Sequence, residues 1–143
     1  MTLAWTNARL GVSHALAHQI GARLHVPHGV TSCITLPAVM AWSLPWAQAR
    51  LAVMAGKSLF DGNAEGEASL AQAVVVAVRE LIAGLDLPTA LDAYSPSKDD
   101  LEAIARLAHR ELSGAGSRDA GVTVEELRGL LLSMLDSTAV AAQ

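Results

Sequence analysis

Apolar residues recur along this chain at spacings of three and four, the pattern of an amphipathic α-helix rather than of a strand. The first predicted helix runs from about Leu3 to Ala22, and one of its faces is formed by Leu10, His14, Ala17 and Gly21. Strand-like alternation is scarce, and Ala and Leu dominate the composition. The sequence therefore predicts an all-α bundle of six or seven helices.

Prolines and glycines divide the next part of the chain. The residues HVPHG at 25–29 are expected to end the first helix. A second helix is predicted over roughly His28–Ser43 with a kink near Pro37, and a third begins after Pro45 and ends by Gly56.

Polar and Gly-rich segments separate the helices of the second half. Residues 61–69 are expected to form a surface connection before a long helix that ends near Gly84. Residues 87–96 predict a short helical turn followed by a loop. No internal repeat or interdomain linker is visible, so residues 1–143 are expected to form a single all-helical domain.

Two capping boxes predict where the last two helices begin. Ser97 is followed three residues later by Asp100, and Thr123 by Glu126. Apolar residues at helical spacing follow each box. We expect these residues to face the core: Leu101, Ile104, Leu107 and Ala108, then Leu127, Leu130, Leu131 and Met134.

The composition is apolar for a soluble protein, with 52% hydrophobic residues and a mean hydropathy of +0.35. Some apolar surface is therefore expected to face a partner, through the region around residues 24–49, which carries no charge. That stretch is long enough to span a bilayer, but two histidines and three prolines interrupt it. A buried, bent helix pair and no membrane contact are expected.

Charge and cysteine content narrow the partners and the compartment. Residues 1–60 contain four dispersed basic residues and no acid, which is too thin a basic patch to indicate nucleic-acid binding. Cys33 is the only cysteine, so it is expected to be a buried structural thiol rather than a nucleophile. The start of the chain lacks the order of a signal peptide, and a cytoplasmic location is predicted.

Four of the five histidines lie within residues 11–30. On a helix, His14 and His18 are one turn apart and point to the same side. His28 stands between a Pro and a Gly, in a turn that lets the next helix start with this ring aimed back at the first helix. Three neutral imidazoles can ligate Zn²⁺ or Fe²⁺. Histidines that are packed and hydrogen-bonded to backbone are the alternative, because this spacing alone is a weak signal.

Carboxylates are missing from the neighbourhood of these histidines in sequence. Open iron sites usually include a carboxylate that offsets the metal charge. Either a distant acid such as Asp61 or Glu111 folds back onto the site, or the remaining ligands belong to another polypeptide or have been lost. Gly29 is expected to permit a close approach or a positive φ beside His28.

The stretch SHALAHQIGARLHVPHGVTSCITLPAVMAW, residues 13–42, resembles the histidine-rich signature of the iron-containing (group III) alcohol dehydrogenase family. The pattern His-x3-His-x2-Gly-Ala, then Pro-His-Gly, then Leu-Pro-x-Val-Met, keeps the family spacing throughout and resembles the branch that includes maleylacetate reductases. The later segments look like the closing helices of that family, so the resemblance covers nearly the whole chain.

The resemblance implies a dehydroquinate synthase-like helical domain without the N-terminal α/β domain that binds NAD(P) in family members. It assigns metal-ligand positions to His14 and His28, and a catalytic or cofactor-adjacent position to His18. The family's first two ligands, an Asp and a His, precede anything in this chain. The resemblance therefore implies an incomplete Fe²⁺ or Zn²⁺ site and NAD(P) supplied only through a missing domain or a partner.

Three functions are consistent with the sequence. The first is the metal-binding half of an oxidoreductase that acts on a small-molecule substrate together with a nucleotide-binding partner chain. The second is a stand-alone lyase or isomerase that needs no cofactor and uses His18 as acid or base. The third is a non-catalytic binding module. For all three functions, a homo-oligomer is expected where no partner chain covers the apolar face.

Overall fold

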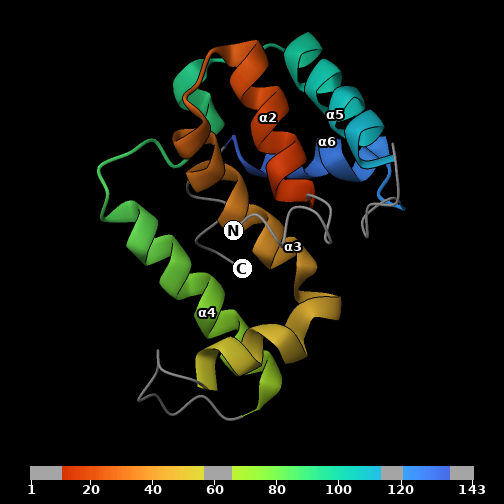
Figure 1. Ribbon diagram of the computed structural model, residues 1–143. Helices are drawn as coiled ribbons and strands as arrows, with labels where there is room; N and C mark the ends of the chain where they lie inside the picture. Colours follow the sequence, from red (N-terminus) through yellow and green to blue (C-terminus); the bar gives the residue numbers. More distant parts are fainter. Residues whose placement is uncertain (1–10, 57–65, 114–120, 136–143) are drawn as a thin grey trace, which may run out of the picture.

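The computed structural model describes residues 11–56, 66–113 and 121–135, which contain helices and no strand (Figure 1). The elements are α2 (Val12–Leu24), α3 (His28–Gly56), α4 (Glu67–Ala83), the short 3-10 helix η1 (Leu91–Tyr94), α5 (Lys98–Ser113) and α6 (Val124–Ser133). The all-α prediction is confirmed. The predicted count of six or seven helices is slightly too high for the described part of the chain, which holds five α-helices.

The main error concerns α3, which was expected as two helices and is one helix of 29 residues. Pro37 and Pro45 both lie inside it. Each proline removes one backbone hydrogen bond, and Figure 1 shows α3 changing direction towards its C-terminal end. Because α3 packs on α2 at one end and along α4 at the other, tertiary contacts hold the helix together across both prolines.

The same helix is long and apolar enough to cross a membrane by length and composition alone. Of its most apolar 18-residue window, 28% is buried inside the molecule. The expectation of a buried helix is thus only partly met. A single helix of this kind is weak evidence for a membrane span, since core helices of soluble proteins share these properties.

The described helices form a body and an arm. The body is built from α2, the first part of α3, η1, α5 and α6, around a core of large buried side chains that includes Leu16, Ile20, Ile34 and Leu131. The arm is the second part of α3 packed on α4, with a smaller core around Leu51. Figure 1 shows α4 and the end of α3 extending away from α2, α5 and α6.

Both capping boxes are present in the structure. Ser97 Oγ accepts from the Asp100 backbone N–H at 3.1 Å, and Asp100 Oδ2 accepts from the Ser97 N–H at 3.0 Å. Thr123 and Glu126 form the same reciprocal pair. The core residues expected after the boxes are buried, except Leu107, which is 36% exposed.

The other predicted elements of the second half are also found. The long helix α4 ends at Ala83 with Gly84 as its C-cap, and η1 supplies the short turn. Of the predicted connection at 61–69, residues 61–65 lie outside the described residues, and α4 begins within the rest of this segment, at Glu67. The predicted helical residues 3–10 also lie outside the described residues. Within them, α2 begins at Val12 and ends at Leu24.

Candidate metal centre

Two helices and the turn between them bring three histidines together. His14 and His18 lie one turn apart on α2, and His28 is the first residue of α3. One nitrogen of each ring lies within 4.8 Å of the others. The ring centroids are 3.9 Å apart for His14 and His18, 5.1 Å for His14 and His28, and 5.4 Å for His18 and His28. The convergence expected from the sequence is therefore observed.

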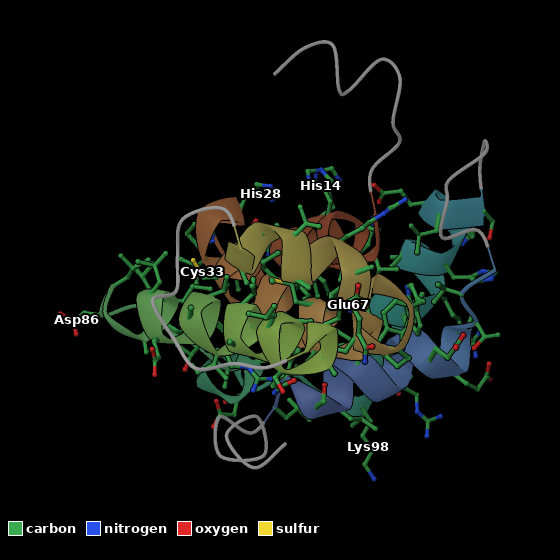
Figure 2. All side chains as sticks on the ribbon, turned by 90° about the horizontal axis from the view of Figure 1, so that it is seen from below. His14, His28, Cys33, Glu67, Asp86 and Lys98 are labelled. Carbon is green, nitrogen blue, oxygen red and sulfur yellow. The ribbon has the colours of Figure 1, made fainter. Side chains whose placement is uncertain are left out.

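The cluster is at the surface of the body rather than inside it. His14 is half-buried, and His18 and His28 are exposed. Figure 2 shows His14 and His28 projecting from the same face of the molecule, at the edge opposite to Lys98. The rings of His18 and His28 are therefore open to solvent, whereas Nε2 of His14 is buried.

The turn between α2 and α3 sets the position of His28. The backbone of His25 ends α2 in the left-handed conformation, with φ 55°. Val26 is then buried in the core, and the Pro27 carbonyl accepts the backbone N–H of Val30 at 2.9 Å. The buried hydroxyl of Thr31 donates to the His28 carbonyl at 2.8 Å. These contacts fix the first turn of α3 and with it the position of the His28 backbone.

The glycine that permits close packing here is Gly21, and not Gly29 as the sequence suggested. A Cβ on Gly21 would lie 3.1 Å from the Val26 carbonyl oxygen, whereas a Cβ on Gly29 would meet nothing within 4 Å. Gly29 also does not have a positive φ. It is an ordinary residue of the first turn of α3, so the close approach comes from the α2 side of the turn.

A hydroxyl pair holds α2 against α3 next to His14. The oxygens of Ser13 and Thr35 are 3.0 Å apart, and Thr35 is fully buried. Ser13 directly precedes His14 in α2. The hydrogen bond therefore limits sliding of α2 along α3 at the level of the cluster.

One distant acid does fold back onto the site. Glu111, in the last turn of α5, places Oε1 3.2 Å from His18 Nδ1. Its second oxygen accepts from Gln19 Nε2 at 2.9 Å. The other acid considered from the sequence, Asp61, lies outside the described residues. The sequence named Glu111 only as one of two possibilities, since nothing local connects residues 18 and 111.

The environment of His14 favours its neutral form. Burial is the largest cause that lowers the pKa of His14 from its usual 6.5, and the charges of His18 and His28 lower it further. The Glu111 carboxylate acts in the opposite direction on the same pKa. Neutral imidazole is the form that binds a metal, so the shift favours ligation at neutral pH.

Cys33 is not part of the cluster. It is half-buried, where a buried thiol was expected. Figure 2 shows it displaced from His14 along the molecule. Among the described residues, the group of side chains that could hold a metal ion does not include Cys33.

The chain is similar to several known proteins. Residues 1–133 match the C-terminal part of the Fe-containing alcohol dehydrogenase family. The chain is 35% identical over 92 residues to an NADPH-dependent butanol dehydrogenase of Clostridium saccharobutylicum, which covers 64% of this chain and 23% of that protein. It is 31% identical over 112 residues to a 1,3-propanediol dehydrogenase of Citrobacter freundii, covering 76% and 28% respectively.

A more distant relative covers more of the chain. The NAD-dependent methanol dehydrogenase of Bacillus methanolicus is 24% identical over 135 residues, or 93% of this chain and 35% of that protein. The chain thus spans about a quarter to a third of the length of these relatives. By its match over 133 residues and its all-helical structure, the chain belongs to the Fe-containing alcohol dehydrogenase family, as a C-terminal helical domain.

Proposed function

We propose that this chain is the helical, metal-binding domain of an iron-type alcohol dehydrogenase, with His14 and His28 as metal ligands and His18 as the catalytic histidine. The observation that carries the proposal is the convergence of three ring nitrogens, one from each histidine, within 4.8 Å of one another. The donor set fits Fe²⁺ or Zn²⁺, because both metals accept neutral imidazoles. The lowered pKa of His14 supplies that form at neutral pH.

The two proposed ligands do not complete a coordination shell, which takes four or more ligands in most zinc and iron proteins. We infer that the other ligands and the NAD(P) site belong to a nucleotide-binding portion, on the same polypeptide or on a partner chain. The names of two relatives, an NADPH-dependent and an NAD-dependent dehydrogenase, support a nicotinamide cofactor. A site shared in this way would also hold the two portions together.

In the complete enzyme the metal would act as a Lewis acid on the substrate oxygen while hydride moves to or from the nicotinamide. His14 and His28 would hold it from the helical side. His18 would accept the proton of an alcohol at Nε2 and return it in the reverse direction. Its Nδ1 faces Glu111, so Nε2 is the nitrogen left for this task.

The signature and the named relatives point to two different substrate classes. The signature in residues 13–42 favours a maleylacetate reductase-like branch, whereas the relatives are named as dehydrogenases of butanol, 1,3-propanediol and methanol. We therefore propose a small alcohol or carbonyl compound as the substrate. A cytoplasmic location is a separate proposal. Assays that compare maleylacetate with short-chain aldehydes distinguish the two branches.

The cofactor-free alternative has one observation in its favour. His18 and Glu111 form a carboxylate–imidazole pair that can serve as an acid or base without a metal. Lyase or isomerase activity of the chain in the presence of a chelator and without nicotinamide would support this function over the first.

Metal titration of the purified chain tests the proposed ligands. We expect weak binding of Zn²⁺ or Fe²⁺, because half a ligand set gives low affinity. His14→Ala and His28→Ala should abolish the binding, and His18→Ala should reduce it less. Calorimetry measures the metal affinity, and elemental analysis after gel filtration measures the amount of bound metal.

The matched control is His25→Asn, which removes a nearby exposed imidazole and retains a side chain that tolerates positive φ. Its metal affinity should equal that of the wild type. Binding that survives both His14→Ala and His28→Ala, or that His25→Asn also abolishes, would contradict the assignment.

A further inference from the structure

One contact links the histidine cluster to a distant part of the chain. Glu111 lies 93 residues from His18 and meets it with Oε1 at 3.2 Å from Nδ1. We propose that Glu111 is a positioning residue for His18: its carboxylate holds the ring in the tautomer protonated at Nδ1 and leaves Nε2 as the nitrogen available for proton transfer. The inference rests on the proposed catalytic role of His18.

The chemistry of the two groups gives the direction of the hydrogen bond. An ionised carboxylate accepts hydrogen bonds and cannot donate them. A neutral imidazole carries one N–H, so the nitrogen that faces Glu111 is the protonated one. The other nitrogen then has a free lone pair. A hydrogen bond at one ring nitrogen sets the tautomer in this way in many metal and catalytic sites.

Gln19 fixes the carboxylate from the other side. Its Nε2 donates to Glu111 Oε2 at 2.9 Å, while Oε1 faces His18. His18 and Gln19 are consecutive residues of α2, so both oxygens are held by one short segment of one helix. The plane of the carboxylate is therefore set by α2, and its distance from His18 does not depend on a flexible loop.

The helix that carries Glu111 is itself well anchored. The next residue, Leu112, is 2% exposed and belongs to the main core. At the other end of the contact between α2 and α5, Arg23 Nε donates to Asp100 Oδ1 at 2.6 Å. This hydrogen bond links the end of α2 to the start of α5. Figure 1 shows α2 and α5 side by side. The approach of Glu111 to His18 thus follows from the docking of two rigid helices.

Exposure decides what this contact can do. The side chains of His18 and Glu111 are 42% and 32% exposed. A partly exposed pair contributes little to folding stability, because water screens the charges. Its effect on which ring nitrogen carries the proton does not need a large energy. We therefore expect loss of Glu111 to change the tautomer of His18 and leave the fold intact.

Nitrogen NMR of the ¹⁵N-histidine-labelled, metal-free chain tests the inference at a pH where the rings are neutral. The His18 signals are identified as those that His18→Asn removes. In the wild type we expect a protonated Nδ1 and an unprotonated Nε2. In Glu111→Ala the two signals should shift towards each other, as both tautomers become populated.

Related variants separate positioning from a structural effect. Gln19→Ala should cause a smaller shift in the same direction, and Glu111→Asp should restore part of the wild-type pattern. Glu102→Ala, also on α5, removes an acid that pairs with Arg106 instead; it should leave the His18 signals unchanged. Circular dichroism confirms that each variant is folded. If Glu111→Ala does not fold, Gln19→Ala and Glu111→Gln carry the test.

A wild-type His18 protonated at Nε2, or an unchanged pattern in Glu111→Ala, would overturn the inference. Because neither metal nor nicotinamide is present, such a result leaves the proposed ligands His14 and His28 untouched. Conversely, failure of the metal titration with an intact tautomer effect would defeat the proposed metal site and retain the contact between Glu111 and His18.

Discussion

At the scale of single residues, the site depends on contacts that differ greatly in how visible they are from the sequence. The spacing of His14 and His18 predicts that the two rings share a face, because a helix turn brings such residues together. The Pro-His-Gly turn adds His28. The contact between Glu111 and His18 cannot be derived from spacing, because it depends on how α5 docks on α2. Gly21 was missed as a packing residue for a related reason: its neighbour belongs to a turn whose path the sequence does not specify.

Gly21→Ala is expected to weaken metal binding. Its Cβ would lie 3.1 Å from the Val26 carbonyl, so the turn that carries His28 must shift by a few tenths of an ångström. In a helix interior, alanine normally raises the free energy of unfolding by about 1 kcal/mol relative to glycine. The displacement of the turn should offset much of this gain in stability. Metal titration and urea unfolding measure both effects.

Two glycines on open surfaces provide the controls for this prediction. A Cβ on Gly29, beside His28, or on Gly129, inside α6, would meet nothing within 4 Å. Gly29→Ala should therefore retain the wild-type metal affinity, and Gly129→Ala should stabilise the fold by roughly 0.5–1 kcal/mol. Equal affinities for Gly21→Ala and Gly29→Ala would show that the turn does not position His28.

At the scale of elements, the starts of α5 and α6 were predicted well, whereas the course of α3 was not. A capping box acts through residues three apart, so the sequence contains the whole signal. Whether a proline ends a helix depends on what packs around it. The burial of Pro37 and the contact of α3 with α4 were not visible in the sequence.

Thr123→Ala should destabilise the protein by about 1 kcal/mol, since the start of α6 loses its side-chain cap. Thr123→Ser retains the hydroxyl and should lie close to the wild type. Chemical unfolding of the three proteins gives the difference. An equal loss for both variants would indicate that the methyl group of Thr123, and not its cap, is what α6 needs.

The start of α5 should influence stability in acid. The pKa of Asp100 is lowered from 3.8 to about 2. Hydrogen bonds from the side chain and backbone of Ser97 are the largest causes, and the hydrogen bond from the Arg23 side chain is the next largest. The contribution of a carboxylate with a lowered pKa is complete above pH 3.8 and is lost as the pH falls towards 2. The wild type should therefore lose stability between pH 4 and 2.

Asp100→Asn should be less stable than the wild type at pH 7 and show a smaller further loss across this acid range. Unfolding curves at pH 7, 4 and 2 measure the difference between the two proteins. Asp99→Asn is the matched control, since Asp99 is the adjacent exposed acid and makes no part of the box. The prediction fails if Asp99→Asn and Asp100→Asn have the same pH profile.

At the scale of the whole molecule, the described surface contains several large apolar side chains. Trp46 is 62% exposed, Val53 58% and Met54 53%, all on the second part of α3. Trp42 and Trp46 stack edge to face with ring centroids 4.7 Å apart. Large apolar patches are unusual on a monomer, and burying the face of α3 that carries these side chains would gain roughly 25 cal/mol per Å² before the cost of association.

We therefore expect the chain to self-associate at micromolar concentration through this face. Trp46→Gln should shift the equilibrium towards the monomer in sedimentation velocity. Leu132→Gln removes an apolar side chain of similar exposure from α6 and should have no such effect. A monomeric wild type across the micromolar range would contradict the prediction.

The short distance in sequence between the three histidines has a consequence for the order of folding. All three rings come from residues 14–28, within one helix pair and its turn. Closing so small a loop costs little entropy, and contacts between close neighbours in sequence form early. The contact with Glu111 spans 93 residues and forms only when α5 docks. During synthesis the three histidine rings can therefore come together before Glu111 reaches His18.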